Sequence, residues 1–544
     1  MKRRISGILL AALFLFLTFQ GHSWADAPER FFLLGNNQKA QVIDSDGRVL
    51  ASLTLDKGPQ QVITNQRGEK LFLCKDKGHW SLSLLKPDYT AYQKEFERAA
   101  VLTAFAINRQ HSYFWALSQS VAQGGPSELL RINLMNLESQ QIPLDSPGVS
   151  ITLTPGEERL IVTTAGTDPL SANLCFFEAD SLIIRQTIAI AKNPAANYFS
   201  QDGRVLLATS YGYNSNLKNL APKTLVKTAT PIPAAAYFID LNTMQLRKQV
   251  QLDELSVDYV AKNRTVYALV AEKNQGRVVC LDESGNAATY RVDFIPKQVE
   301  IAAERSELYV IGNKEVAVFH IGDEHLVCKF QFNWKIDQLV IPADSAYGLI
   351  YHPTNRGILT VLDLNNRQII KTLPLGRSYM VAWKALGYTA SIVEGDVFVL
   401  LDAPDIIFRT GDILTIPQKK LAYIYNNFSL DITAVDTEKK EVIKRIGCDL
   451  GAACNLLYTS NQKYLIAIGP DQWKFINVET QKVDLNLRIK WIGLDKKIVP
   501  HFYHSSAGDV LVIANGKKVI WIDLETAKII RKLPTITSDA VIGW

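Results

Sequence analysis

One phrase recurs along the whole chain of 544 residues. It reads VLDLNNRQIIKTLPLG from Val361, VIWIDLETAKIIRKLP from Val519 and QVIDSDGRVLASLTLDKG from Gln41. A unit that repeats at a short, fixed spacing cannot bury both of its faces alone and must stack against its neighbours. The repeat therefore constrains the fold more than composition does, and it favours a repeat architecture.

Each copy begins with an apolar run that ends in Asp or Asn, continues through two or three polar residues, and resumes as an alternating run such as KIIRKL. Alternation is typical of a half-buried strand. An Asp or Asn at this point can bond to its own backbone two residues on and begin a tight hairpin turn. A calcium ligand is the alternative role, but a calcium loop gathers several acids, whereas these occur singly. The positions are Asp44, Asn133, Asp240, Asp282, Asp363, Asp402, Asp436, Asn477 and Asp523.

A third run, such as QQVIT or NYFS, then leads through a polar turn, such as NQRG or SQDG, to a fourth run, such as KLFLC or RVLLATS. Four strands in about forty residues are typical of a β-propeller blade. We therefore predict an all-β protein with about twelve four-stranded blades. The predicted innermost strands lie near Gln61, Ala104, Ile151, Tyr198, Tyr259, Val299, Leu339, Val381, Leu414, Leu457, Phe502 and Val541.

The repeat resembles the YVTN-type, WD40-like β-propeller repeat of bacterial and archaeal surface proteins. The resemblance rests on VIDSDGRVLASLTLDKGPQQVITNQRGEKLFL and FSQDGRVLLATS, and it extends over nearly the whole chain after the N-terminus. No copy contains YVTN itself. The resemblance implies the propeller fold; it carries over no catalytic residue, because the motif is structural.

Both ends of the chain are predicted to complete one blade. The last inner strand, at 538–544, has no partners after it, while RFFLLGNN, AQVID and VLASLTL near the N-terminus supply three strands. Twelve blades exceed the usual four to eight per ring, which favours two propellers, 28–295 (closed by 538–544) and 296–537. A boundary near Phe294–Lys297 gives six and six blades. Seven and five, with a boundary near Asn333, and a single large ring remain alternatives.

The N-terminus, MKRRISGILLAALFLFLTFQGHSWADAPER, has a basic start, an apolar run from Ile5 to Phe19 and then small residues. This pattern predicts a signal peptide over 1–25 with cleavage after Ala25, and an uncleaved anchor is the alternative. The protein is therefore expected to be exported, to the periplasm or to the cell surface and beyond. The formal charge of +5 falls to about +2 without Lys2, Arg3 and Arg4, which argues against a nucleic-acid partner.

The six cysteines fall into two groups. Cys74, Cys175, Cys280 and Cys328 lie in apolar runs and are interpreted as small buried hydrophobes. Cys448 and Cys454 flank DLGAA between two strands and could close that loop as a disulfide.

Three consecutive predicted blades carry an enlarged loop between their second and third strands, counted from the inside. These loops are SQSVAQGGPS from Ser118, AGTDPLSAN from Ala165 and SYGYNSNLKNLAPKTLVKTATPIPAA from Ser210, whereas most other blades keep a minimal turn here. Loops held by a rigid scaffold commonly bind partners, although a solvated insertion is the alternative. The longest loop contains no acid and carries the candidate contact residues Tyr211, Tyr213, Lys218, Lys223 and Lys227, which suit an anionic partner or a glycan.

Signals for catalysis are weak. His501 and His504 fall on opposite faces of one strand, His320 and His325 form no motif, and no C-x-x-C-H, G-x-S-x-G, H-E-x-x-H or P-loop occurs. We predict no metal and no cofactor. The sequence favours a non-catalytic propeller scaffold that binds a protein or an envelope polymer. The alternatives are a propeller enzyme, either a lactonase or a quinone-dependent dehydrogenase, and a structural cell-surface component.

Overall fold

The computed structural model describes residues 30–543 apart from short connecting segments and four longer stretches, 212–232, 376–388, 401–412 and 489–500. The described chain is almost entirely β-strand, and its helical residues form two single turns of 3-10 helix, η2 (Ala303–Arg305) and η3 (Pro417–Lys419). Within the described residues no helix is long and apolar enough to cross a membrane. The expected signal peptide lies outside them.

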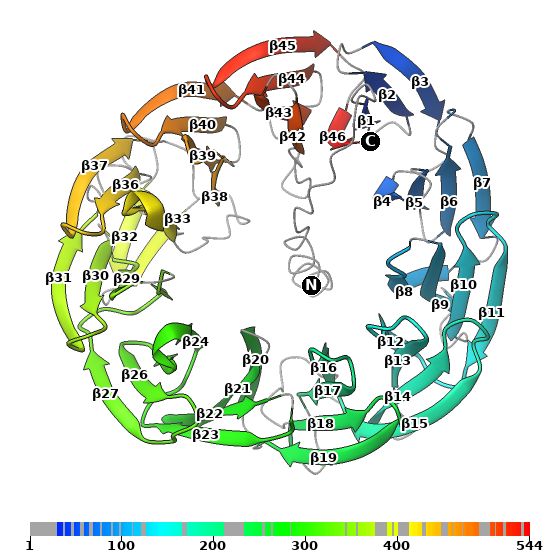
Figure 1. Cartoon of the computed structure of the whole chain (residues 1–544), viewed down its shortest axis with the longest axis horizontal. Coiled ribbons are helices and arrows are strands. Elements are labelled where there is room, and N and C mark those ends of the chain that lie inside the picture. The colour runs from blue at the N-terminus through cyan, green and yellow to red at the C-terminus, as the bar shows by residue number, and fades with distance from the viewer. Residues whose placement is uncertain are drawn as a thin grey trace.

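Eleven antiparallel sheets of four strands each follow one another around a circle, with one strand of every sheet toward the centre (Figure 1). The innermost strands are β4 (Pro59–Thr64), β8 (Ala100–Ile107), β12 (Gly148–Leu153), β16 (Pro194–Phe199), β20 (Ser256–Lys262), β24 (Gln298–Ala302), β28 (Gln338–Val340), β34 (Ile413–Ile416), β38 (Asn455–Tyr458), β42 (His501–Ser505) and β46 (Ser538–Gly543). These strands contain eleven of the twelve predicted inner positions; the twelfth, Val381, lies outside the described residues.

The middle strands of each sheet are the most buried. The second strands are β5 (Lys70–Asp76), β9 (Tyr113–Ser120), β13 (Arg159–Ala165), β17 (Val205–Ser210), β21 (Thr265–Glu272), β25 (Glu307–Ile311), β29 (Tyr347–His352), β35 (Leu421–Asn426), β39 (Tyr464–Ile468), β43 (Gly508–Ala514) and β1 (Arg30–Gly35). The third strands are β6 (His79–Leu85), β10 (Ser127–Asn133), β14 (Ser171–Glu178), β18 (Ala235–Asp240), β22 (Gln275–Leu281), β26 (Glu315–His320), β30 (Ile358–Asp363), β36 (Asp431–Asp436), β40 (Gln472–Asn477), β44 (Lys518–Asp523) and β2 (Lys39–Asp44). Since neighbouring sheets cover both of their faces, these strands are continuous apolar runs; every residue of β17, for example, is buried.

The outermost strands are largely exposed, as in β19, where six of seven residues are exposed. They are β7 (Ala91–Phe96), β11 (Ser139–Leu144), β15 (Ile184–Ala191), β19 (Gln245–Gln251), β23 (Ala287–Val292), β27 (Leu326–Gln331), β31 (Gln368–Pro374), β37 (Glu441–Gly447), β41 (Lys482–Arg488), β45 (Lys528–Pro534) and β3 (Val49–Thr54). Their exposure explains the alternation of the recurring phrase, whose second half they form.

The two ends of the chain share a sheet, as predicted. Strand β46 pairs antiparallel with β1 in the register Leu33↔Val541, and the order of this sheet is β3-β2-β1-β46. This pairing covers the inner edge of β1, which would otherwise have no partner strand.

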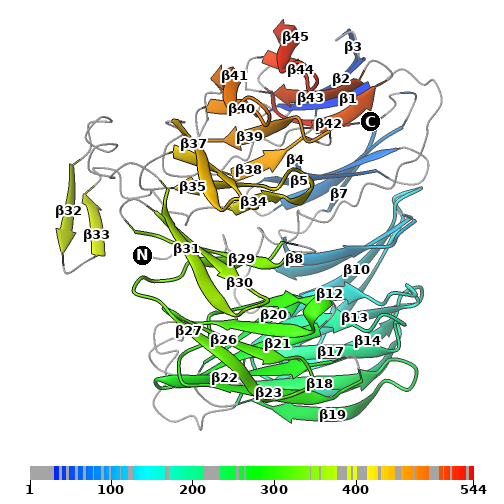
Figure 2. The ribbon, with the colours of Figure 1, turned by 60° about the vertical axis from the view of Figure 1, so that its left-hand side comes forward.

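The twelfth expected blade is described as a hairpin. Strands β32 (Thr389–Val393) and β33 (Asp396–Leu400) pair only with each other within the described residues. This hairpin stands apart from the wall of sheets (Figure 2). The sheet before it packs directly against the sheet after it, through Leu359 and Leu373 on one side and Ile424 and Val435 on the other. Among the described residues, eleven four-stranded sheets and this hairpin thus stand where about twelve blades were expected.

Apolar cores join the sheets on both sides of each expected domain boundary. At Phe294–Lys297, Tyr290 and Phe294 belong to one cluster with Leu308 and Phe319 of the next sheet. At Asn333, a single cluster likewise spans the sheets that contain β25 and β30. The described sheets therefore pack in succession across both positions, and the division into 28–295 and 296–537 stays a prediction.

The predicted turn role of the recurring Asp and Asn is confirmed in eight of nine positions, and the ninth, Asp402, lies outside the described residues. Each of the eight accepts a hydrogen bond from the backbone two to four residues on; Asp523 Oδ1, for instance, accepts from the N–H groups of Glu525 at 2.7 Å and Thr526 at 3.1 Å. Such Asx turns reverse the chain between the third and fourth strands.

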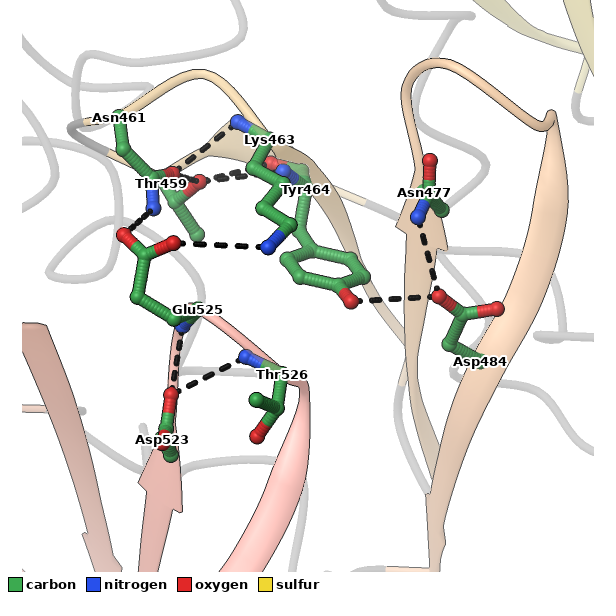
Figure 3. A network of polar contacts seen from close by, with 9 residues as sticks. All are labelled: Thr459, Asn461, Lys463, Tyr464, Asn477, Asp484, Asp523, Glu525 and Thr526. Carbon is green, nitrogen blue, oxygen red and sulfur yellow. Dashed lines mark hydrogen bonds and ion pairs between the residues drawn. The ribbon is translucent and has the colours of Figure 1, made fainter.

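The same turns fasten neighbouring sheets together. Figure 3 shows Glu525, in the β44–β45 turn, accepting from Asn461 Nδ2 at 2.6 Å and pairing with Lys463 at 3.4 Å, both from the preceding sheet. An equivalent contact joins an earlier pair of sheets. Arg305, between β24 and β25, donates to the carbonyl of Leu364, which follows β30 in the next sheet, at 3.1 Å. These polar links hold the face of the ring opposite to the enlarged loops.

Candidate functional site

The three enlarged loops emerge on one face of three neighbouring sheets. They join β9 to β10, β13 to β14 and β17 to β18, which are the second and third strands of consecutive sheets. Because every sheet is antiparallel with the same order, its second-to-third connections all lie at the same end. We call this end the long-loop face. Apolar clusters join the first sheet to the second and the second to the third, so the loops are neighbours.

Each loop begins where a paired strand ends. The ladders continue to Gln119↔Ser127, Ala165↔Ala172 and Ser210↔Ala235, directly beneath the segments 121–126, 166–170 and 212–232. The paired strands therefore hold the two described ends of each segment next to each other.

The base of the longest loop is tied to the neighbouring sheet. Tyr259, on β20, donates its hydroxyl hydrogen to the Ser210 carbonyl at 2.7 Å and lies 3.4 Å from the Ala235 carbonyl. The Tyr211 N–H donates to the Asn193 carbonyl at 2.8 Å. Both ends of the loop are therefore held by contacts outside the β17–β18 hairpin.

Four tyrosines, which we call the tyrosine cluster, gather at this base: Tyr198, Tyr211, Tyr237 and Tyr259. The rings of Tyr211 and Tyr259 lie 5.5 Å apart at 51°. The Tyr237 hydroxyl oxygen accepts a hydrogen bond from the Ala191 N–H at 2.8 Å. Tyr211 is 42% exposed, whereas Tyr237 is buried and Tyr259 is partly buried, so the cluster presents the Tyr211 ring to solvent.

The hydroxyl groups of all four tyrosines stay protonated, and therefore uncharged, over the physiological pH range. Burial raises the pKa of Tyr259, Tyr198 and Tyr237 above the ordinary value, and burial together with the nearby Asp258 carboxylate raises the pKa of Tyr211. A neutral phenol next to apolar ring surface can donate or accept hydrogen bonds and can stack on a partner.

Of the predicted site residues, the structure places Tyr211 at the loop base. Tyr213, Lys218, Lys223 and Lys227 lie outside the described residues, as do Cys448 and Cys454 with their predicted disulfide. Sequence reasoning missed Tyr198, Tyr237 and Tyr259, because they lie on strands that are separated in sequence and resemble ordinary core positions. The partial signal was the recurrence of tyrosine in NYFS, AAYFID and VDYV around the long loop.

Of the cysteines predicted to be buried, Cys175 is buried, Cys280 and Cys328 are partly exposed, and the side chain of Cys74 lies outside the description. Cys175, Cys280 and Cys328 are free thiols, and burial raises the pKa of Cys280 to about 11. Their low thiolate content makes them poor nucleophiles.

The described residues contain no group of three or more His, Cys, Asp or Glu side chains placed to hold a metal ion. His320 and His325 are exposed, while His501 and His504 lie on β42 opposite Val512 and Asp509. Sequence reasoning also missed His352, which is fully buried between Phe332 and Trp334, with ring centroids at 5.3 and 5.7 Å. Its nitrogens contact the Lys335 carbonyl at 3.1 Å and the Thr360 hydroxyl at 3.0 Å.

No family model matches the sequence, and a comparison with curated proteins finds no match. Solved structures that match include the dihydro-heme d1 dehydrogenase NirN in complex with DHE, at 12% identity and a TM-score of 0.30, over 65% of this chain and 75% of that chain. They also include BamB from Moraxella catarrhalis, at 11% identity and a TM-score of 0.31, over 69% and 95%. Similarity at this level says nothing about what this chain binds, and the YVTN-type repeat stays a resemblance.

Proposed function

We propose that the chain is an exported, non-catalytic β-propeller scaffold that binds a protein or a surface polymer through the long-loop face. The observation that carries this proposal is the tyrosine cluster, which fixes the base of the longest loop and presents one exposed ring beside it. The hairpins that carry the other two enlarged loops, β9–β10 and β13–β14, belong to the two preceding sheets of the series.

Rigid aromatic side chains are effective contact groups because they bury a large area and lose little conformational entropy on binding. The Tyr211 ring rests on Tyr259 and its backbone is bonded to Asn193, so little ordering is needed when a partner arrives. Beyond it, the segment 212–232 contributes Tyr213, Lys218, Lys223 and Lys227 and no acid, which suits an anionic protein surface or an acidic glycan.

The test compares the wild type with two variants in capture from an envelope fraction, followed by measurement of the affinity for the captured component in purified form. In the first variant, 212–233 is replaced by a four-residue Gly-Asn turn; the second is Tyr211→Ala. We expect both variants to fold, the loop replacement to abolish binding and Tyr211→Ala to weaken it about tenfold, as removal of an aromatic hot spot does.

Tyr458→Ala is the matched control, because Tyr458 is 40% exposed on β38, in a sheet remote in sequence from the loops. It should bind as the wild type does. Folding and capture that are both unchanged by the loop replacement would refute this site. Cell fractionation tests export separately, and a chain found only in the cytoplasm would refute that part.

A further inference from the structure

A second surface lies on the outer wall of the ring, where four neighbouring sheets present their outermost strands. These strands are β31, β37, β41 and β45, and we call their exposed surface the outer wall. Apolar clusters join the four sheets in succession, so the strands are consecutive around the perimeter (Figure 1).

The outer wall is strongly cationic. Its four strands contain eight basic and two acidic residues, a net charge of 8 − 2 = +6, although the whole chain has a formal charge of only +5. The basic residues are Lys371, Lys444, Arg445, Lys482, Arg488, Lys528, Arg531 and Lys532, and the acids are Glu441 and Asp484.

Most of this charge is not neutralised locally. Lys371 pairs with Glu441 at 3.6 Å. Five exposed cations form no ion pair with a carboxylate among the described residues, namely Lys444, Lys482, Arg488, Lys528 and Lys532.

On the described outermost strands β15, β19, β23 and β27 of earlier sheets, three of five cations pair with a carboxylate, whereas Lys248 bonds to the Gly285 carbonyl and Arg291 forms no ion pair among the described residues. There Arg185 pairs with Glu178, Arg247 with Asp240 and Lys329 with Asp293. The outer wall is therefore distinguished by the number of its unpaired cations, five on neighbouring strands, and not by the mere presence of basic residues.

Branched aliphatic side chains lie among these cations and are open to solvent. Their exposed fractions are 45% for Ile369, 38% for Ile370, 47% for Ile443, 37% for Val483 and 56% for Ile530. Lysine on an edge strand can serve simply to prevent edge-to-edge aggregation. Charge of either sign would prevent such aggregation, and exposed isoleucine would not. Protection of the edge strands therefore does not explain unpaired cations together with exposed isoleucine.

We propose that the outer wall docks on the surface of an anionic lipid bilayer. Unpaired lysine and arginine are attracted to anionic headgroups, and their long side chains can span the gap that a curved wall leaves above a flat surface. The exposed isoleucines enter the interfacial region between headgroups, where apolar side chains are favourable. This surface is independent of the long-loop face.

The test is sedimentation with vesicles, using the whole chain as it is purified. One set of vesicles contains phosphatidylcholine with about a third phosphatidylglycerol, and the other contains phosphatidylcholine alone. Every variant carries the same N-terminus, so differences between variants report on the outer wall. We expect binding to the anionic vesicles only, and weaker binding as salt is raised.

The outer-wall variant is Lys444→Gln with Lys482→Gln and Lys528→Gln, which removes three exposed, unpaired cations. Its binding should fall about tenfold or more, since each lysine near an anionic surface contributes about 1 kcal/mol, or roughly fivefold in affinity. The matched control is Arg185→Gln with Arg247→Gln and Lys329→Gln, which removes three cations already paired with carboxylates and should change binding less than about twofold. Equal losses in the two variants, or no loss in either, would overturn the proposal.

A last variant separates lipid from other polyanions. Ile443→Ser with Ile530→Ser should weaken sedimentation with anionic vesicles and leave binding to soluble heparin unchanged, because heparin offers no apolar interior. If heparin binds and anionic vesicles do not, the wall recognises a soluble polyanion and the lipid assignment is wrong.

Discussion

Single Asp and Asn residues determine where each sheet turns outward. The Asp523 carboxylate accepts two backbone hydrogen bonds and so satisfies donors that a reversing chain would leave without partners. The sequence supported this role from one observation, the isolated position of each acid, and the structure repeats it in every described copy.

Asp523→Ala should therefore cost about 1 kcal/mol of stability, the usual scale for a lost side-chain-to-backbone bond at a turn. Asp523→Asn keeps an acceptor oxygen and should stay within about 0.5 kcal/mol of the wild type. Urea unfolding measures both variants. Equal midpoints for the Ala and Asn variants would show that the turn does not depend on the carboxylate oxygen.

His352 is expected to make the fold acid-sensitive. Burial lowers its pKa below the ordinary value of about 6.5, because the charged ring loses its hydration. The unfolded chain then binds a proton at a higher pH than the folded chain does. The stability associated with neutral His352 is present above pH 6.5 and is lost as the pH falls through the folded pKa.

His352→Gln keeps groups that can contact the Lys335 carbonyl and the Thr360 hydroxyl but does not titrate in this range. Between pH 7.5 and 5 the wild type should lose more of its free energy of unfolding than this variant does. A difference between the two that stays constant over this range would contradict the prediction. His352→Ala, which leaves the buried Thr360 hydroxyl without its partner, should cost about 1–3 kcal/mol or more at neutral pH.

At the scale of elements, the positions of the strands could be predicted from the sequence and the extent of one blade could not. The third runs QQVIT and NYFS coincide with β4 and β16. The period of the repeat and the burial of apolar side chains together determine where an inner strand can lie. The segment around β32 and β33 has the same apolar character, yet its hairpin is not inserted between the sheets on either side. Sequence spacing does not reveal that those two sheets pack directly on each other through Leu373 and Ile424.

The candidate site shows the same limit. The enlarged loops could be located because insertions interrupt a regular repeat. The tyrosine cluster depends on β16, β18 and β20 lying side by side, and its members are separated in sequence by ordinary strand residues. The outer wall could not be predicted from the sequence either, because each strand contributes only one to three charges, which gather when the ring forms.

Deleting Ser538–Trp544 should open the ring. It removes β46, and β1 then loses the strand with which Leu33 is in register. The expected cost is several kcal/mol, or failure to fold, since the ladder hydrogen bonds and the apolar contacts are lost together.

Thermal unfolding of the truncated chain gives the measurement, and the synthetic peptide SDAVIGW, added in excess, should restore part of the lost stability by taking the place of β46. A scrambled peptide of the same composition is the control. Thermal stability that is unchanged by the deletion would refute closure by the terminal strand.

At the scale of the whole molecule, stacking buries the apolar faces that each sheet alone would expose. The middle strands are apolar on both faces, so every sheet needs two neighbours, and only a closed series gives every sheet both. The expectation of two propellers rested on the usual number of blades in a ring. The clusters at Phe294 and at Ile336 continue the apolar cores across both expected boundaries, and the division itself stays a prediction. A rigid ring of this kind can hold the long-loop face and the outer wall in fixed relation to each other.

Electron microscopy of the purified chain tests the central claim most directly, which is that the sheets form one continuous series closed by β46 on β1. Class averages viewed along the axis should show a single ring of neighbouring sheets around one centre. Two smaller rings side by side, joined near residue 295, would contradict the account and restore the division into two propellers.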